Sequence, residues 1–113
     1  MTNEPGVSEA VTHVTGYSGN APGQGPFMKV HLSVAHGIVR EATYETYQCP
    51  GSMACGKALC EMITGASLEA ARAVNHPTLV ERVGPLPRHR QICYGLALLA
   101  LSDALGQLSQ TDR

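Results

Sequence analysis

The sequence contains few charged and few aromatic side chains. Charged residues make up 15% of the chain, aromatic residues make up 4%, and tryptophan is absent. A chain that binds nucleic acid needs basic residues to neutralise phosphates and, for single strands, aromatic rings on which bases stack. The eight basic residues form no stripe, and the net charge is -1. We therefore expect no nucleic acid among the partners of this protein.

The sequence also lacks a long hydrophobic run. Its longest strongly apolar stretch, from Tyr94 to Leu101, is far shorter than the roughly 20 residues that span a bilayer. Residues Met1 to Gly6 lack the basic and apolar regions of a signal peptide. We expect no membrane segment and a cytoplasmic location. Because the cytoplasm keeps thiols reduced, the four cysteines should be free thiols rather than disulfides.

The first half of the chain has the pattern of a small antiparallel sheet. A flexible N-terminal end over residues 1–9 precedes a single domain over residues 10–113. Alternation of apolar and polar side chains predicts strands over Phe27–Val34 and Ile38–Tyr47, joined by a tight hairpin connection. Two weaker segments precede them: an edge strand over residues 10–15 and a glycine-rich loop over residues 16–25.

The second half has helical patterns. We expect helices over Gly51–Thr64, from Ser67 to about Asn75, over Thr78–Val83, and over Arg88–Leu108. Glycine and proline separate these segments, and the last is the longest. Strands followed by helices predict an α+β domain, in which an antiparallel sheet of about three strands carries helices packed on one face.

Two cysteines lie where a thiolate is favoured. Cys49 precedes Pro50 at a predicted strand-to-helix junction, where unpaired backbone N–H groups and the helix dipole stabilise a negative charge. Cys93 lies near the start of the last helix, beside Arg88 and Arg90, whose charges should favour its thiolate in the same way. Thiols at the starts of two elements could converge at one site.

The remaining candidates have plain structural alternatives. No Cys-x-x-Cys motif occurs, and free cysteine is among the most buried residue types, so all four thiols could be core residues. Cys55 lies at the centre of an apolar helical stripe and is expected in the core, whereas Cys60 falls toward the polar side as a peripheral thiol. His89 is the histidine closest in sequence to a candidate cysteine, with a solvated surface residue as the alternative.

Three segments taken together, Tyr47–Gly56, Gly65–Ala71 and Leu86–Cys93, carry a family resemblance. In order and spacing they resemble the IscU/NifU N-terminal family of iron–sulfur cluster assembly scaffolds. The similarity extends from about Gln24 to about Leu108 and implies the α+β arrangement already predicted.

The resemblance also implies a site. The family holds a nascent cluster or a zinc ion on three cysteines, an aspartate and a histidine while a cysteine desulfurase delivers sulfur. Cys49 and Cys93 match two of these cysteines, whereas the other three positions fall at Gln24, Pro26 and Ile92. Proline and isoleucine offer no side-chain ligand. Replacement ligands could come from Cys55, His89 or the Gln24 oxygen, or from a second subunit of a homo-oligomer.

Three functions are therefore open for this chain. In the favoured one, Cys49 accepts persulfide sulfur, and Cys49 and Cys93 bind an iron–sulfur cluster, iron or zinc. The protein is then not an enzyme. A cysteine desulfurase and acceptor proteins are its expected partners. In the second, the chain is an accessory interaction module that has lost the metal site. In the third, it is a dithiol redox protein, whose disulfide would need the Cα atoms of Cys49 and Cys93 within about 7 Å.

Overall fold

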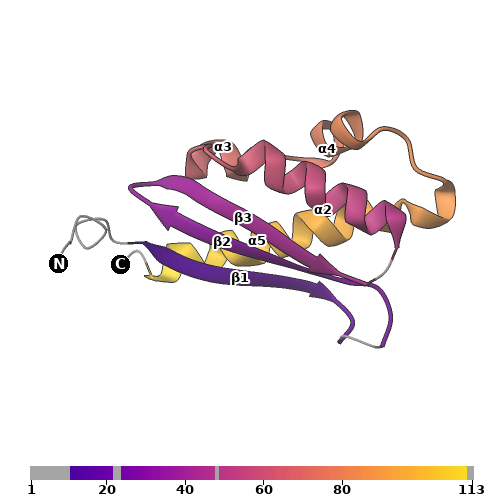
Figure 1. Cartoon of the computed structure of the whole chain (residues 1–113), viewed down its shortest axis with the longest axis horizontal. Coiled ribbons are helices and arrows are strands. Elements are labelled where there is room, and N and C mark those ends of the chain that lie inside the picture. The colour runs from indigo at the N-terminus through magenta and orange to yellow at the C-terminus, as the bar shows by residue number, and fades with distance from the viewer. Residues whose placement is uncertain (1–10, 22–23, 48, 112–113) are drawn as a thin grey trace.

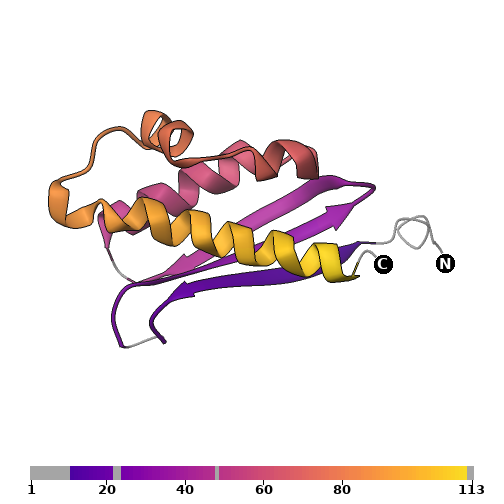
Figure 2. The same ribbon diagram turned by 180° about the vertical axis from the view of Figure 1, so that it is seen from behind.

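The computed structural model describes residues 11–21, 24–47 and 49–111, so the N-terminal end expected over residues 1–9 lies outside the described residues. Three antiparallel strands, β1 (Thr12–Gly19), β2 (Phe27–Ala35) and β3 (Ile38–Thr46), form one sheet in the order β1-β2-β3. The helices that follow pack on one face of this sheet (Figures 1 and 2). The predicted α+β class is confirmed.

Strand β2 shows why the alternation predicted a half-buried sheet. Its even-numbered side chains are buried under the helices, namely Met28, Val30, Leu32 and Val34. The side chains between them face the other side, where His31 Nε2 lies 2.7 Å from Glu45 Oε2 on the neighbouring strand. The hairpin between β2 and β3 turns through His36 and Gly37, which have φ angles of 54° and 73°. This left-handed backbone conformation is common at tight hairpin turns.

Strand β1 is longer than the sequence predicted. The expected strand ended at residue 15 and was followed by a loop, but the strand continues to Gly19 and pairs Gly16 with Val30. A Cβ atom on Gly16 would lie 1.8 Å from the carbonyl oxygen of Ala100. Gly16 is therefore a point where a strand and a helix approach closely, and the interpretation of this glycine as a loop residue was wrong.

The helical half contains α2 (Pro50–Ile63), α3 (Leu68–Arg72), α4 (His76–Val83), a 3-10 turn η1 (Arg88–Arg90) and α5 (Ile92–Thr111). Helix α3 ends earlier than predicted, because Asn75 is the N-cap of α4 and its side chain accepts a hydrogen bond from the Thr78 amide. The long helix predicted from Arg88 is divided, since a short 3-10 turn precedes α5.

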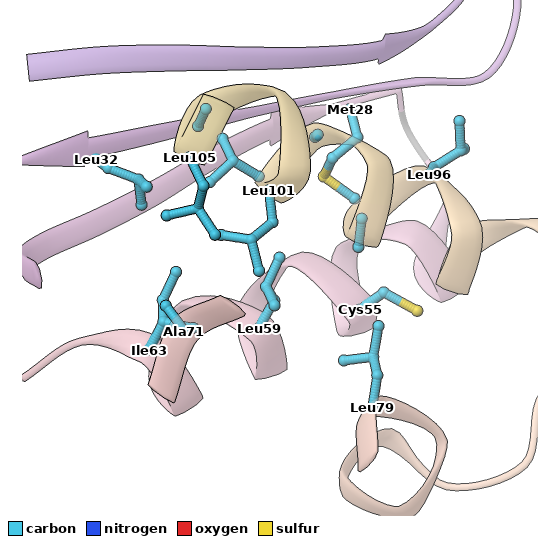
Figure 3. Packing of buried hydrophobic residues seen from close by; sticks show 14 of the residues in the cluster. Met28, Leu32, Cys55, Leu59, Ile63, Ala71, Leu79, Leu96, Leu101 and Leu105 are labelled. Atoms are coloured by element: carbon cyan, nitrogen blue, oxygen red, sulfur yellow. The ribbon is translucent and has the colours of Figure 1, made fainter. Parts of the chain in front are cut away.

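Helices α2 and α5 supply most of the core that covers the sheet. Leu59 of α2 and Leu101 of α5 meet there, with Leu32 of the sheet nearby (Figure 3). In the described part of the chain, the stretch Arg88–Leu108 is long and apolar enough by composition to cross a membrane, and half of that window is buried inside the domain. The core position of α5 accounts for this composition.

Candidate functional site

One end of the sheet gathers the segments that the sequence singled out. The register pairs Gly19 with Phe27 and Met28 with Thr46, so the connection between β1 and β2 lies at the same end as the exit of β3 into α2 (Figure 1). The start of α5 reaches this end too, because the Ser18 hydroxyl donates to the Leu96 carbonyl oxygen at 2.5 Å.

Cys49 is the N-cap residue of α2, and its side chain is 6% exposed. The Arg90 guanidinium donates a hydrogen bond from Nη1 to Cys49 Sγ at 2.8 Å. Burial alone would raise the pKa of Cys49, but several groups outweigh it: the Ser52 amide, the Tyr47 hydroxyl, the Gly51 amide and the positive charge of Arg90. The pKa of Cys49 is lowered to about 6. The thiol is therefore mostly a thiolate at neutral pH.

Cys93 lies at the second position of α5 and is fully buried. The hydroxyl of the buried Ser52 donates to Cys93 Sγ at 3.0 Å, while the backbone amide of the same residue serves Cys49. A Cβ atom on Gly51 would lie 3.4 Å from Cys93 Sγ. The structure thus brings the two predicted cysteines together around the same two residues of α2.

The other two cysteines are core residues. Cys55 is fully buried in the cluster that contains Leu59 and Leu79 (Figure 3), and burial raises its pKa to about 12. The expectation that Cys60 is peripheral was wrong: it is 7% exposed, and burial raises its pKa to about 11. Helix α2 packs against α4 as well as against β3 and α5. The sequence pattern predicted a single buried face of this helix, so it did not predict that a second face, which contains Cys60, is buried as well.

The remaining candidate ligands lie on the surface. His89 is exposed, and its Nε2 atom lies 3.3 Å from Arg90 Nε. Gln24 is exposed in the connection between β1 and β2. Ile92, which offers no side-chain ligand, is 57% exposed. Among the residues that the structure describes, no group of three or more histidine, cysteine, aspartate or glutamate side chains could hold a metal ion. The two thiols alone supply fewer donors than the four of a tetrahedral zinc site.

Three contributors to the site were missed or misplaced by sequence reasoning. Arg90 was expected to act on Cys93, but its guanidinium contacts Cys49. Ser52 and Tyr47 were not singled out, although both lie within three residues of Cys49. The available signal was the three-residue spacing from Arg90 to Cys93, which is close to one helical turn and places Arg90 just before α5 and Cys93 in its first turn.

The protein is thus a small α+β domain that holds two thiols close to the junction of a strand and a helix. Comparison with known proteins assigns its family. The family described as NifU-like N terminal domain matches residues 2–112, and the chain belongs to it. The family resemblance of the three segments is confirmed.

Three curated relatives illustrate the similarity. The chain is 33% identical over 86 residues to the iron-sulfur cluster assembly scaffold protein IscU of Buchnera aphidicola subsp. Acyrthosiphon pisum (strain APS), covering 75% of this chain and 67% of that protein. It is 31% identical over 86 residues to IscU of Escherichia coli (strain K12), covering 75% and 66%. It is 36% identical over 81 residues to the nitrogen fixation protein NifU of Cereibacter sphaeroides, covering 72% and 33%. The chain thus spans between one third and two thirds of the length of these relatives.

Proposed function

We propose that this protein serves iron–sulfur cluster assembly as a scaffold-type sulfur carrier, with Cys49 as the thiol that accepts sulfur. Membership of the NifU-like family and the similarity to IscU proteins named as iron-sulfur cluster assembly scaffolds support a role in this process. One observation carries the role of Cys49: its sulfur is held by the Arg90 guanidinium at 2.8 Å, beside the amides that begin α2. Such surroundings stabilise an anionic sulfur atom.

The proposed step is a transfer of sulfane sulfur. The Cys49 thiolate attacks the outer sulfur of a persulfide on a cysteine desulfurase. A sulfur–sulfur bond forms at Cys49, the bond to the donor sulfur breaks, and the donor leaves as a thiolate. The exchange needs no outside oxidant or reductant. Because Cys49 is 6% exposed, the donor has to dock closely, and the exposed Met53 and Ile92 in the first turns of α2 and α5 offer it apolar contacts.

Cluster, iron or zinc binding is the second part of the proposal, with the metal as cargo. Cys49 and Cys93 supply two thiolates, and a tetrahedral site needs two further donors. Gln24 lies at the same end of the sheet and His89 adjoins Arg90, whereas Cys55 has a raised pKa in the core. A second copy of the chain or an acceptor protein would otherwise complete the set. Thiolate chemistry of this kind requires a reducing compartment such as the cytoplasm.

A dithiol redox function is a second candidate with an observation of its own. Ser52 contacts Cys49 through its amide and Cys93 through its hydroxyl, so the two thiols share one neighbour. A disulfide between them would remove the sulfur acceptor. The interaction-module alternative, by contrast, predicts that neither thiol changes chemically when partners bind.

Labelled sulfur distinguishes these functions. The full chain is incubated with a cysteine desulfurase and cysteine that carries radioactive sulfur, and protein-bound label is counted before and after reduction. We expect the wild type and the control Cys60→Ala to gain label that reductant removes, and Cys49→Ala to gain none. Label that persists in Cys49→Ala would contradict the assignment. A protein that gains no label would favour the interaction module, and a Cys49–Cys93 disulfide formed without label would favour the dithiol function.

A further inference from the structure

The guanidinium of Arg90 lies beside Cys49, where a bound metal cation would also have to lie. We propose that Arg90 is a specificity-determining residue that makes Cys49 accept sulfur and exclude divalent metal for as long as the guanidinium stays in place. This inference rests on the proposed role of Cys49 in cluster assembly.

The position of Arg90 is fixed from several sides. Nη1 contacts Cys49 Sγ at 2.8 Å, and Nε lies 3.3 Å from His89 Nε2. The aliphatic stem lies over Gly51, where a Cβ atom would be 3.5 Å from both Cβ and Cδ of Arg90. The arginine stem thus packs within van der Waals distance of Gly51. The guanidinium is held against the sulfur by packing as well as by charge.

Metal and sulfur make opposite demands on this contact. A zinc ion on Cys49 would lie about 2.3 Å from Sγ, beside the positively charged guanidinium of Arg90. The two cations would share one sulfur and repel each other, so the metal binds only after Arg90 has moved away. A persulfide on Cys49 remains a sulfur anion when ionised, and it keeps the arginine as its partner.

An order of events follows for this chain. Sulfur reaches Cys49 while Arg90 is in place, and metal enters only when the guanidinium has left. Zinc should therefore bind the wild type weakly, and removal of the charge should strengthen its binding.

The test measures zinc affinity by competition with a chromophoric chelator. Arg90→Met keeps an unbranched apolar stem over Gly51 and removes the charge, whereas Arg90→Lys keeps the charge. Arg88→Met is the matched control, since Arg88 is an exposed arginine of the same 3-10 turn. A hydrogen bond to a charged group contributes enough that its loss should raise zinc affinity about tenfold to a hundredfold in Arg90→Met. Arg90→Lys and Arg88→Met should stay within about threefold of the wild type.

Each outcome is decisive once circular dichroism has shown that the variants are folded. Equal zinc affinity in the wild type and Arg90→Met overturns the inference, and so does an equal rise in Arg88→Met. If Arg90→Met does not fold, Arg90→Ala replaces it and is made both in the wild-type chain and together with Cys49→Ala. Zinc affinity should then rise only in the chain that keeps Cys49. Labelled sulfur on the wild type tests the proposed function separately. A chain that takes no sulfur but gains zinc affinity in Arg90→Met would contradict that function and leave metal exclusion intact.

Discussion

The start and the middle of helix α2 carry the same side chain in opposite chemical states. Cys49 at the start and Cys60 in the third turn are exposed to nearly the same extent, 6% and 7%. Burial raises the pKa of both, yet that of Cys49 ends at about 6 and that of Cys60 at about 11. The difference lies in the neighbours, because amides, a hydroxyl and a guanidinium face Cys49 while the carboxylate of Glu61 adds to the burial of Cys60. Donors and charge, more than exposed area, set the reactivity of a thiol here.

Alkylation at neutral pH should show the largest effect of this difference. With a small iodoacetamide-type reagent at pH 7, Cys49 should react at least about a hundredfold faster than Cys55 or Cys60, because Cys49 is mostly thiolate while burial raises the pKa of the other two. Peptide mapping by mass spectrometry over a time course measures the rates. Faster modification of Cys60 than of Cys49 would reverse the comparison between the two parts of α2.

Truncation in the middle of the helix should affect stability strongly. Leu59 is fully buried, so Leu59→Ala should lower the free energy of unfolding by about 2–5 kcal/mol. Urea denaturation followed by circular dichroism measures the loss. Cys49→Ala, at the edge of the core, is the comparison. If it lowers the free energy of unfolding as much as Leu59→Ala does, the main role of Cys49 is in packing.

The pH profile of Cys49 alkylation should have its midpoint near the thiol pKa of about 6. The thiolate reacts and the thiol does not, so the rate is at its plateau above this pH and falls as the pH drops through it. In Arg90→Met the loss of the guanidinium should move the midpoint upward by about one pH unit. A profile that does not move would mean that the helix amides and the Tyr47 hydroxyl stabilise the thiolate without Arg90.

Removal of the Ser52 hydroxyl should have the smallest effect. Ser52→Ala leaves the amide that faces Cys49 and deletes the 3.0 Å hydrogen bond to Cys93 Sγ. The free energy of unfolding should fall by about 1 kcal/mol, and the Cys49 midpoint should shift by less than about half a pH unit. Urea titration and the alkylation profile measure the two effects. A midpoint shift as large as that in Arg90→Met would show that the Ser52 hydroxyl stabilises the Cys49 thiolate as strongly as Arg90 does.

Local patterns in the sequence were enough to predict the hairpin and the thiol junction. Strands β2 and β3 follow from alternation, and Cys49 could be placed at a helix start because Pro50 follows it. Contacts between distant segments could not be foreseen. Gly16 fits under Ala100 and Ala104 of α5, more than eighty residues later in the chain, and Arg90 turns toward Cys49 instead of its sequence neighbour Cys93. Sequence periodicity describes one helix or strand at a time, whereas these contacts depend on how two distant segments pack against each other.

Mapping of the sulfur added by a cysteine desulfurase is the most direct test of the role of Cys49. The wild-type chain is loaded at neutral pH in the presence of a metal chelator, the remaining thiols are blocked, and the peptides are analysed by mass spectrometry. The account predicts one added sulfur atom on the peptide that contains Cys49 and none on those that contain Cys55 and Cys60. Added sulfur on Cys55 or Cys60, with Cys49 unmodified, would contradict it.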